Sequence, residues 1–234
     1  GSWYHEAGVS DAYQYPLSTQ QLAEIEDQVK KVELLAVPTA ELERISTAGL
    51  VETVLGYPYF SSAFLFNTPQ MGIDSTIRSL GSYQELVSRS DAADKLLAVY
   101  QRAELAKIIR LSEFPTLEFP IFEGVLCQDE VLQQLDAEGR RQLLQLAVKN
   151  YGLKEHEYAD IFSSNSSTLR LILKTLYFDD SDFAALARKY PDVTAFMETG
   201  FPAVNSEEDL DRFWDEAAEL LLKHGYGQFL EQLG

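Results

Sequence analysis

Hydrophobic residues recur at three- and four-residue steps through most of the chain, which is the spacing of amphipathic helices. Between residues 19 and 32 this stripe consists of Leu22, Ile25, Val29 and Val32. Ser18 or Thr19 is placed to cap its first turn, so the pattern predicts one helix over this range.

Cap residues and helix stops predict further helices in the first half. Pro38-Thr39 and Ser46-Thr47 each begin one, and Gly56 with Pro58 ends the second. Thr68-Pro69 is a cap followed by a first-turn proline and predicts a helix to about residue 80. A longer helix is expected from Asp91, with Leu96, Leu97, Tyr100, Ala103 and Ile108 on one side.

The second half carries the same helical spacing. Helices are expected over residues 129–135, 136–151 with a stop at Gly152, 168–178, 180–190 and 207–224. The range 168–178 is apolar almost all round, so we expect it to be central and buried. The last helix has Leu210, Phe213, Trp214, Ala217, Leu220 and Leu221 in register.

No run alternates apolar and polar residues for long enough to indicate a strand. The prediction is therefore an all-α protein, an irregular multi-helix array of about ten helices. Helices recur without a fixed period of about 33–47 residues, which argues against a regular solenoid. Phe114-Pro115 and Phe119-Pro120 interrupt the pattern and suggest an ordered crossover of extended chain.

This interruption divides the predicted chain into four parts. Residues 1–15 form a tail, 16–111 a helical subdomain, 112–126 the Pro/Phe-rich crossover, and 127–234 a second helical subdomain. The two subdomains are expected to form either one compact unit or two helical halves. Gly1-Ser2 looks like the scar of a cleaved tag, so we expect the native N-terminus to be missing.

The chain is acidic, with 37 Asp+Glu against 19 Lys+Arg and a formal net charge of −18. This balance argues against nucleic acid as a main partner, because phosphate binding needs clustered Lys and Arg. No window approaches the roughly 18 uninterrupted apolar residues of a membrane helix, so no membrane insertion is expected. Residues 118–234 hold 22 of the acids and 10 of the bases, with many acids at predicted helix starts.

Catalytic signatures are scarce. The sequence contains no Gly-x-Ser-x-Gly elbow, no Ser-x-x-Lys pair and no Gly-x-x-x-x-Gly-Lys phosphate loop. The single cysteine, Cys127, permits no intrachain disulfide and is expected to be a small buried residue. No catalytic residue and no cofactor is assigned.

One pair of residues is a weak candidate for a metal site. His156 and Asp160 stand at i and i+4, so on a helix they would share a face and could hold a divalent ion. Glu157 stands where a zinc hydrolase keeps its general base, but a second histidine is missing. The alternative is a solvated acidic turn formed by Lys154, Glu155, His156 and Glu157.

A second acidic run, Asp179-Asp180-Ser181-Asp182, lacks the Gly and the terminal Glu of a calcium loop. Capping of the next helix explains it. Aromatic residues gather near Trp3-Tyr4, Tyr13, Tyr15, Tyr57–Phe60, Phe64 and Phe66. Most are expected in the core, and the remainder leave room for a surface that binds protein or carbohydrate.

Two segments resemble a known group of proteins. They are Ser46-Thr47-Ala48-Gly49-Leu50-Val51-Glu52-Thr53-Val54-Leu55-Gly56-Tyr57-Pro58-Tyr59-Phe60 and Leu86-Val87-Ser88-Arg89-Ser90-Asp91-Ala92-Ala93-Asp94-Lys95-Leu96-Leu97-Ala98-Val99-Tyr100. Over about residues 16–110 the chain resembles uncharacterised exported all-helical proteins of Gram-positive bacteria. The resemblance implies a helical fold and an extracellular or cell-envelope location, and it supplies no activity.

The leading functional hypothesis is a non-enzymatic exported helical module that acts through a protein or ligand interaction surface. One alternative is a carboxylate- or metal-dependent hydrolase, with metal at His156 and Asp160. Another is a cytosolic adaptor or regulatory protein. A protein partner is compatible with each of these.

Overall fold

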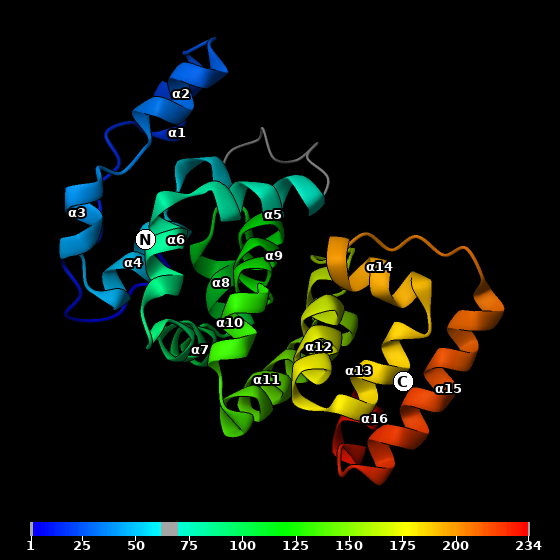
Figure 1. Cartoon of the computed structure of the whole chain (residues 1–234). Coiled ribbons are helices and arrows are strands. Elements are labelled where there is room, and N and C mark those ends of the chain that lie inside the picture. Colours follow the sequence, from blue (N-terminus) through cyan, green and yellow to red (C-terminus); the bar gives the residue numbers. More distant parts are fainter. Residues whose placement is uncertain (1, 62–69, 234) are drawn as a thin grey trace. The chain divides into compact units, whose positions relative to one another are not determined.

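The computed structural model of the chain describes residues 2–61 and 70–233, and these are helical with no strand among them (Figure 1). The all-α prediction is confirmed, with more helices than the ten expected. Several ranges that the hydrophobic pattern joins are divided in the structure. The chain splits into two compact units, Gly1–Val125 (unit 1) and Leu126–Gly234 (unit 2).

The helices that begin in unit 1 are short. They are α1 (Thr19–Ala23), α2 (Gln28–Leu34), α3 (Thr39–Arg44), α4 (Thr47–Leu55), the 3-10 helix η1 (Pro58–Ser61), α5 (Gln70–Ser79), α6 (Gly81–Ser88), α7 (Ala92–Arg102), α8 (Leu105–Leu111) and α9 (Pro115–Leu126). Helix α4 lies at the centre and packs on α6 and α7. As predicted, Ser46 caps its N-terminus and Gly56 follows its last residue.

The N-terminal segment packs along α4. The backbone N–H of Tyr13 donates to Thr53 Oγ1 at 3.0 Å, and the hydroxyl of Tyr15 donates to the Thr53 carbonyl at 2.7 Å. Trp3 is buried and its ring lies 5.4 Å from that of Phe122. The residues expected to form a tail up to position 15 therefore contribute to the core of unit 1.

The single helix predicted over residues 19–32 is wrong. Ser18 does cap α1, but the chain leaves the helix after Ala23, and Asp27 starts α2 by accepting hydrogen bonds from the backbone of Val29 and Lys30. A side chain that can cap a helix competes with helix continuation, and here the cap is formed. Val29 is consequently 67 % exposed rather than part of a buried stripe.

The expectation of extended chain at 112–126 is also wrong, because residues 115–126 form α9. Pro115 occupies the first turn, where a missing N–H costs nothing. Pro120 stands inside the helix and removes a hydrogen bond, at a cost of about 3 kcal/mol. Burial of Phe119 and Phe122 offsets this cost. Thr68-Pro69, Phe64 and Phe66 lie outside the described residues.

Unit 2 contains longer helices. They are α10 (Asp129–Gln134), α11 (Ala137–His156), α12 (Ser166–Asp179), α13 (Ser181–Arg188), α14 (Pro191–Thr199), α15 (Glu207–Lys223) and α16 (Gly227–Leu233). As predicted, α12 is largely buried, and it packs against α11, α13 and α14. The predicted stop at Gly152 is wrong, because α11 continues to His156. A helical Gly costs only about 1 kcal/mol relative to Ala, which the packing of α11 on α12 exceeds.

Candidate functional site

Two neighbouring hollows in unit 2 form an apolar groove between α12 and α15, which we call the α12–α15 groove. The larger hollow has a volume of about 550 Å³ and is lined by Tyr151, Leu169, Trp214, Ala217, Ala218, Leu221 and Leu230. The smaller, of about 140 Å³, is lined by Leu169, Leu173, Asp192, Val193, Phe196, Pro202, Ala203, Val204, Leu210, Phe213 and Trp214. Leu169 and Trp214 line both hollows, so the two adjoin at these residues along α15.

The amphipathic pattern of α15 positions the groove residues. Phe213, Ala217 and Leu221 recur at four-residue steps and are buried against the rest of unit 2. The adjacent row Leu210, Trp214 and Ala218 is only half-buried and lies at the groove. The apolar stripe of α15 is thus wider than the face that the unit itself covers.

The opposite wall is fixed by a buried arginine. Arg170 of α12 donates from Nε to the carbonyl of Met197 at 2.9 Å, and from a terminal nitrogen to the carbonyl of Glu198 at 2.7 Å. These carbonyls belong to the last turn of α14, where helix carbonyls lack intrahelical partners. The guanidinium therefore ties the C-terminal end of α14 to α12.

The rim of the smaller hollow is formed by the irregular segment 200–206, which joins α14 to α15 (Figure 1). Asp192 holds it: its Oδ2 accepts from the backbone of Asn205 at 2.8 Å and of Ser206 at 3.1 Å. The hydrogen bonds from Ser206 and Asn205 lower the pKa of Asp192. Gly200 starts the segment with φ of 73°, a conformation that suits glycine.

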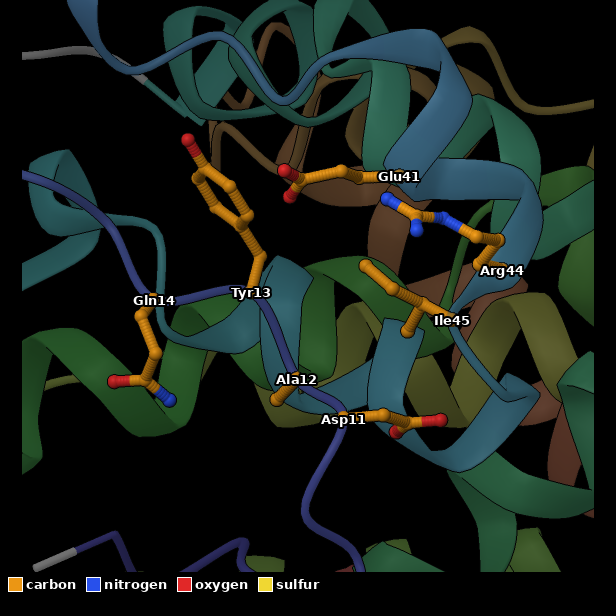
Figure 2. A pocket seen from close by; sticks show the side chains of 7 residues that line it. All are labelled: Asp11, Ala12, Tyr13, Gln14, Glu41, Arg44 and Ile45. Carbon is orange, nitrogen blue, oxygen red and sulfur yellow. The ribbon is translucent and has the colours of Figure 1, made fainter.

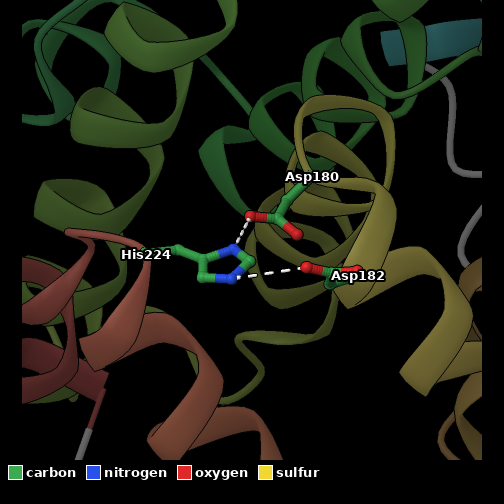
Figure 3. Close-up of side chains that lie close together, drawn as sticks. All are labelled: Asp180, Asp182 and His224. Atoms are coloured by element: carbon green, nitrogen blue, oxygen red, sulfur yellow. Dashed lines mark hydrogen bonds and ion pairs between the residues drawn. The ribbon is translucent and has the colours of Figure 1, made fainter.

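A polar junction lies at the C-terminal end of α15. His224 Nδ1 is 2.5 Å from Asp180 Oδ2, and its Nε2 is 3.4 Å from Asp182 Oδ2. Figure 3 shows the imidazole ring between the two carboxylates. Partial burial raises the pKa of Asp180, but hydrogen bonds from His224 and from the Phe183 backbone outweigh it and hold the pKa below its usual value.

These three side chains are the group in the described residues whose ligand atoms lie close enough to hold a metal ion, all within 4.8 Å of one another. In this arrangement Asp180 contacts Nδ1 of the ring, and Asp182 lies 3.4 Å from Nε2. The geometry suits an imidazole that links two carboxylates, which ties α15 to the start of α13.

A polar hollow of about 570 Å³ lies in unit 1 and is lined by Asp11, Ala12, Tyr13, Gln14, Glu41, Arg44 and Ile45 (Figure 2). Its Asp11 carboxylate is engaged on both oxygens, by the backbone N–H of Ser46 at 2.8 Å and by its hydroxyl at 2.9 Å. Asp11 therefore holds the N-terminal segment at the start of α4. Glu41 and Arg44 contribute opposite charges to the same lining.

The pair His156 and Asp160 does not share a helix face. Helix α11 ends at His156, Glu157 is its C-cap, and the chain turns before Asp160. The helical geometry that the metal hypothesis required is wrong, and both side chains are exposed. The alternative, a solvated turn, is wrong for Lys154, which is buried and donates to Thr168 Oγ1 at 3.1 Å.

Other predicted residues lie where the sequence indicates. Cys127 is buried and forms no disulfide, and Asp180 caps α13 by accepting a hydrogen bond from Phe183. Tyr57 and Phe60 are buried, with ring centroids 5.4 Å apart. Among the described residues, no helix combines the length and apolarity that crossing a membrane requires.

Sequence reasoning assigned the groove residues to the core and missed their partial exposure. Leu169 and Trp214 lie in predicted helices, but their position at a shared hollow depends on helix packing that the pattern does not specify. One feature of the sequence indicated this exposure. The apolar residues in 207–224 form two adjacent rows at four-residue steps, whereas one such row is enough for a buried helix face.

Searches against protein-family models, curated proteins and solved structures returned no match to this chain. The site must therefore be interpreted from its own geometry.

Proposed function

We propose that the protein is a non-enzymatic interaction module whose α12–α15 groove binds a helical segment of a partner protein through its apolar face. The observation that carries this proposal is the pair of hollows that meet at Leu169 and Trp214. Apolar walls with few polar groups are typical of sites that take the apolar face of an amphipathic helix.

The groove has the length for such an occupant. Leu210 and Leu221, which line opposite ends, are eleven residues apart on one helix, or about 16 Å. A bound helix of similar length presents apolar residues at i, i+4, i+7 and i+11 along that distance. Trp214 stands at the middle, and tryptophan is enriched among residues that dominate binding energy.

A small polar substrate fits the groove less well. Sites for small molecules combine apolar walls with a few polar groups that converge on the ligand. Here Asp192 is the one carboxylate of the lining, and both of its oxygens accept hydrogen bonds from residues 205 and 206. The lining thus offers a hollow apolar surface rather than a set of polar groups available to a ligand.

The test uses a neutral probe, a helical peptide of about 18 residues with Leu on one face and Gln on the other. Isothermal titration should show binding to the wild-type chain. Ala218→Phe places a ring in the larger hollow and should lower affinity at least tenfold, whereas Ala185→Phe, at an exposed position of α13, should not. No binding, or equal binding by both variants, would contradict the groove function; circular dichroism confirms that both variants fold.

The location is a separate proposal. We infer an extracellular or cell-envelope protein, supported by the resemblance of about residues 16–110 to exported Gram-positive proteins. Immunoblots of culture medium, envelope and cytosol from the source organism test it. Recovery in medium or envelope supports export, and recovery in cytosol alone favours the adaptor alternative.

A further inference from the structure

Building on the groove function above, we propose that the occupant is a basic amphipathic helix, with Lys or Arg beside its apolar face. The observation is a row of carboxylates along the edge of the groove. Glu207, Asp211 and Asp215 stand at i, i+4 and i+8 on α15, and all three are exposed.

Each carboxylate in this row is adjacent to a groove residue. Residues three apart on a helix are surface neighbours. Glu207 therefore lies beside Leu210, Asp211 beside Trp214, and Asp215 beside Ala218. The apolar row and the acidic row run in parallel along the same edge of the groove.

Helix stability does not explain Asp211 and Asp215 of the acidic row. Carboxylates in the first turn of a helix are stabilised by its dipole, which accounts for Glu207, Glu208 and Asp209. That effect falls off within one turn, so it does not reach Asp211 or Asp215. Asp is also a poor helix former in the interior. These two residues thus disfavour the helix slightly while placing negative charge beside the groove.

The rest of α15 and of unit 2 is also negatively charged. Helix α15 carries seven carboxylates and two bases, and unit 2 as a whole carries 20 Asp+Glu against 10 Lys+Arg. Two bases of unit 2 are engaged with carboxylates: Arg212 pairs with Asp209 at 2.7 Å, and Lys174 pairs with Asp129 at 2.7 Å. The groove edge therefore presents net negative charge to an incoming helix, which favours a cationic one.

The same charge disfavours other occupants of an apolar groove. A second copy of the chain brings a formal charge of −18 of its own. An anionic membrane surface is repelled likewise. A helix with cations flanking an apolar face can pack on the apolar row and pair its cations with the acidic row.

The experiment compares three peptides with the same Leu face and with Lys, Gln or Glu on the polar face. At low salt the Lys peptide should bind about tenfold tighter than the Gln peptide, and the Glu peptide weakest. The preference should shrink at 0.5 M salt, because ions screen exposed charges.

Two matched variants test whether the preference for the Lys peptide comes from the acidic row. D211N/D215N removes two charges beside the groove and should abolish most of the preference for the Lys peptide over the Gln peptide. E24Q/E33Q removes two exposed charges in unit 1 and should leave the preference intact. Sedimentation of the chain alone should give a monomer.

The outcomes separate the two proposals. If no peptide binds, the groove function fails. If the Gln and Lys peptides bind equally, or if E24Q/E33Q has the same effect as D211N/D215N, the groove function stands and the basic partner is wrong. If the chain self-associates and D211N/D215N strengthens the association, the occupant is a second copy and the inference is overturned.

Discussion

Arg170 and Met197 are joined by a hydrogen bond of 2.9 Å from the guanidinium Nε to the backbone carbonyl, and the arginine side chain is buried. This bond connects the central helix of unit 2 with the end of α14. It keeps one wall of the α12–α15 groove in place without a partner. A groove that is already formed loses less conformational entropy when it binds.

Arg170→Met tests this role. The substitution retains apolar volume but leaves the carbonyls of Met197 and Glu198 without their donor, at a cost of about 3 kcal/mol. The melting temperature should fall by several degrees, as measured by circular dichroism. Arg110→Met, at an exposed position of α8, should change it little. Equal melting temperatures for the two variants would show that the bonds to α14 are dispensable.

Asp192→Ala should make the segment that forms the rim of the smaller hollow more mobile. Without its carboxylate the segment 203–206 loses three hydrogen bonds, so its amides should exchange faster with solvent and peptide affinity should fall a few-fold. Hydrogen exchange followed by mass spectrometry measures the first effect. Asp160→Ala, in the exposed turn after α11, is the control.

The same contact predicts a pH dependence. Because hydrogen bonds from Ser206 and Asn205 lower the pKa of Asp192 below its usual value, the folded state favours the ionised form. The rim contact is therefore complete above about pH 4 and is lost as pH falls through the lower folded-state pKa. Chemical shifts of the Asn205 and Ser206 amides should follow this titration in the wild type and not in Asp192→Ala.

Asp180 is predicted to stabilise unit 2 in two ways. It caps α13 and it contacts His224, so Asp180→Ala should cost about 1 kcal/mol for the cap alone. Asp180→Asn keeps an oxygen for the Phe183 N–H but loses the charge, and should be less harmful. Since the pKa of Asp180 is lowered, its charge-dependent stabilisation is present above about pH 4 and disappears on acidification. The gap in melting temperature between wild type and Asp180→Asn should therefore narrow as pH falls below about 4. A gap that is the same at all pH values would contradict an ionic contribution.

In unit 1, Tyr100 and Glu123 should be coupled. The Tyr100 hydroxyl donates to Glu123 Oε2 at 2.8 Å, and both side chains are buried. Tyr100→Phe removes this buried hydrogen bond and should destabilise the unit by about 1 kcal/mol. In a double-mutant cycle with Glu123→Met, which has no oxygen to accept this bond, the two effects should not add. Additive effects would mean that the bond contributes nothing to stability.

Local structure was predictable where one side chain decides it. Ser18, Ser46 and Asp180 each cap the helix that the sequence indicates, because the cap needs only the hydroxyl or carboxylate and the next three residues. Helix propensity did not predict the structure where side-chain packing determines it. Pro120 was interpreted as a helix breaker, but burial of its neighbours keeps α9 helical.

The site was less predictable because its parts are far apart along the chain. His224 contacts Asp180 across 44 residues, and Leu169 and Trp214 line the same hollow although two helices and a loop separate them in sequence. Hydrophobic spacing identifies which residues face inward on one helix, but it does not specify which helices meet. The pair chosen from spacing alone, His156 and Asp160, depended on α11 continuing four residues further than it does.

Fluorescence of Trp214 tests the central claim most directly. The chain has two tryptophans, and Trp3 can be replaced by Phe, so that Trp214 alone reports. If the groove binds the Leu-faced peptides, their addition should shift the Trp214 emission to shorter wavelength and protect it from acrylamide, with the Lys peptide effective at the lowest concentration. Emission and quenching that stay unchanged at saturating peptide would contradict the assignment of the α12–α15 groove as the binding site.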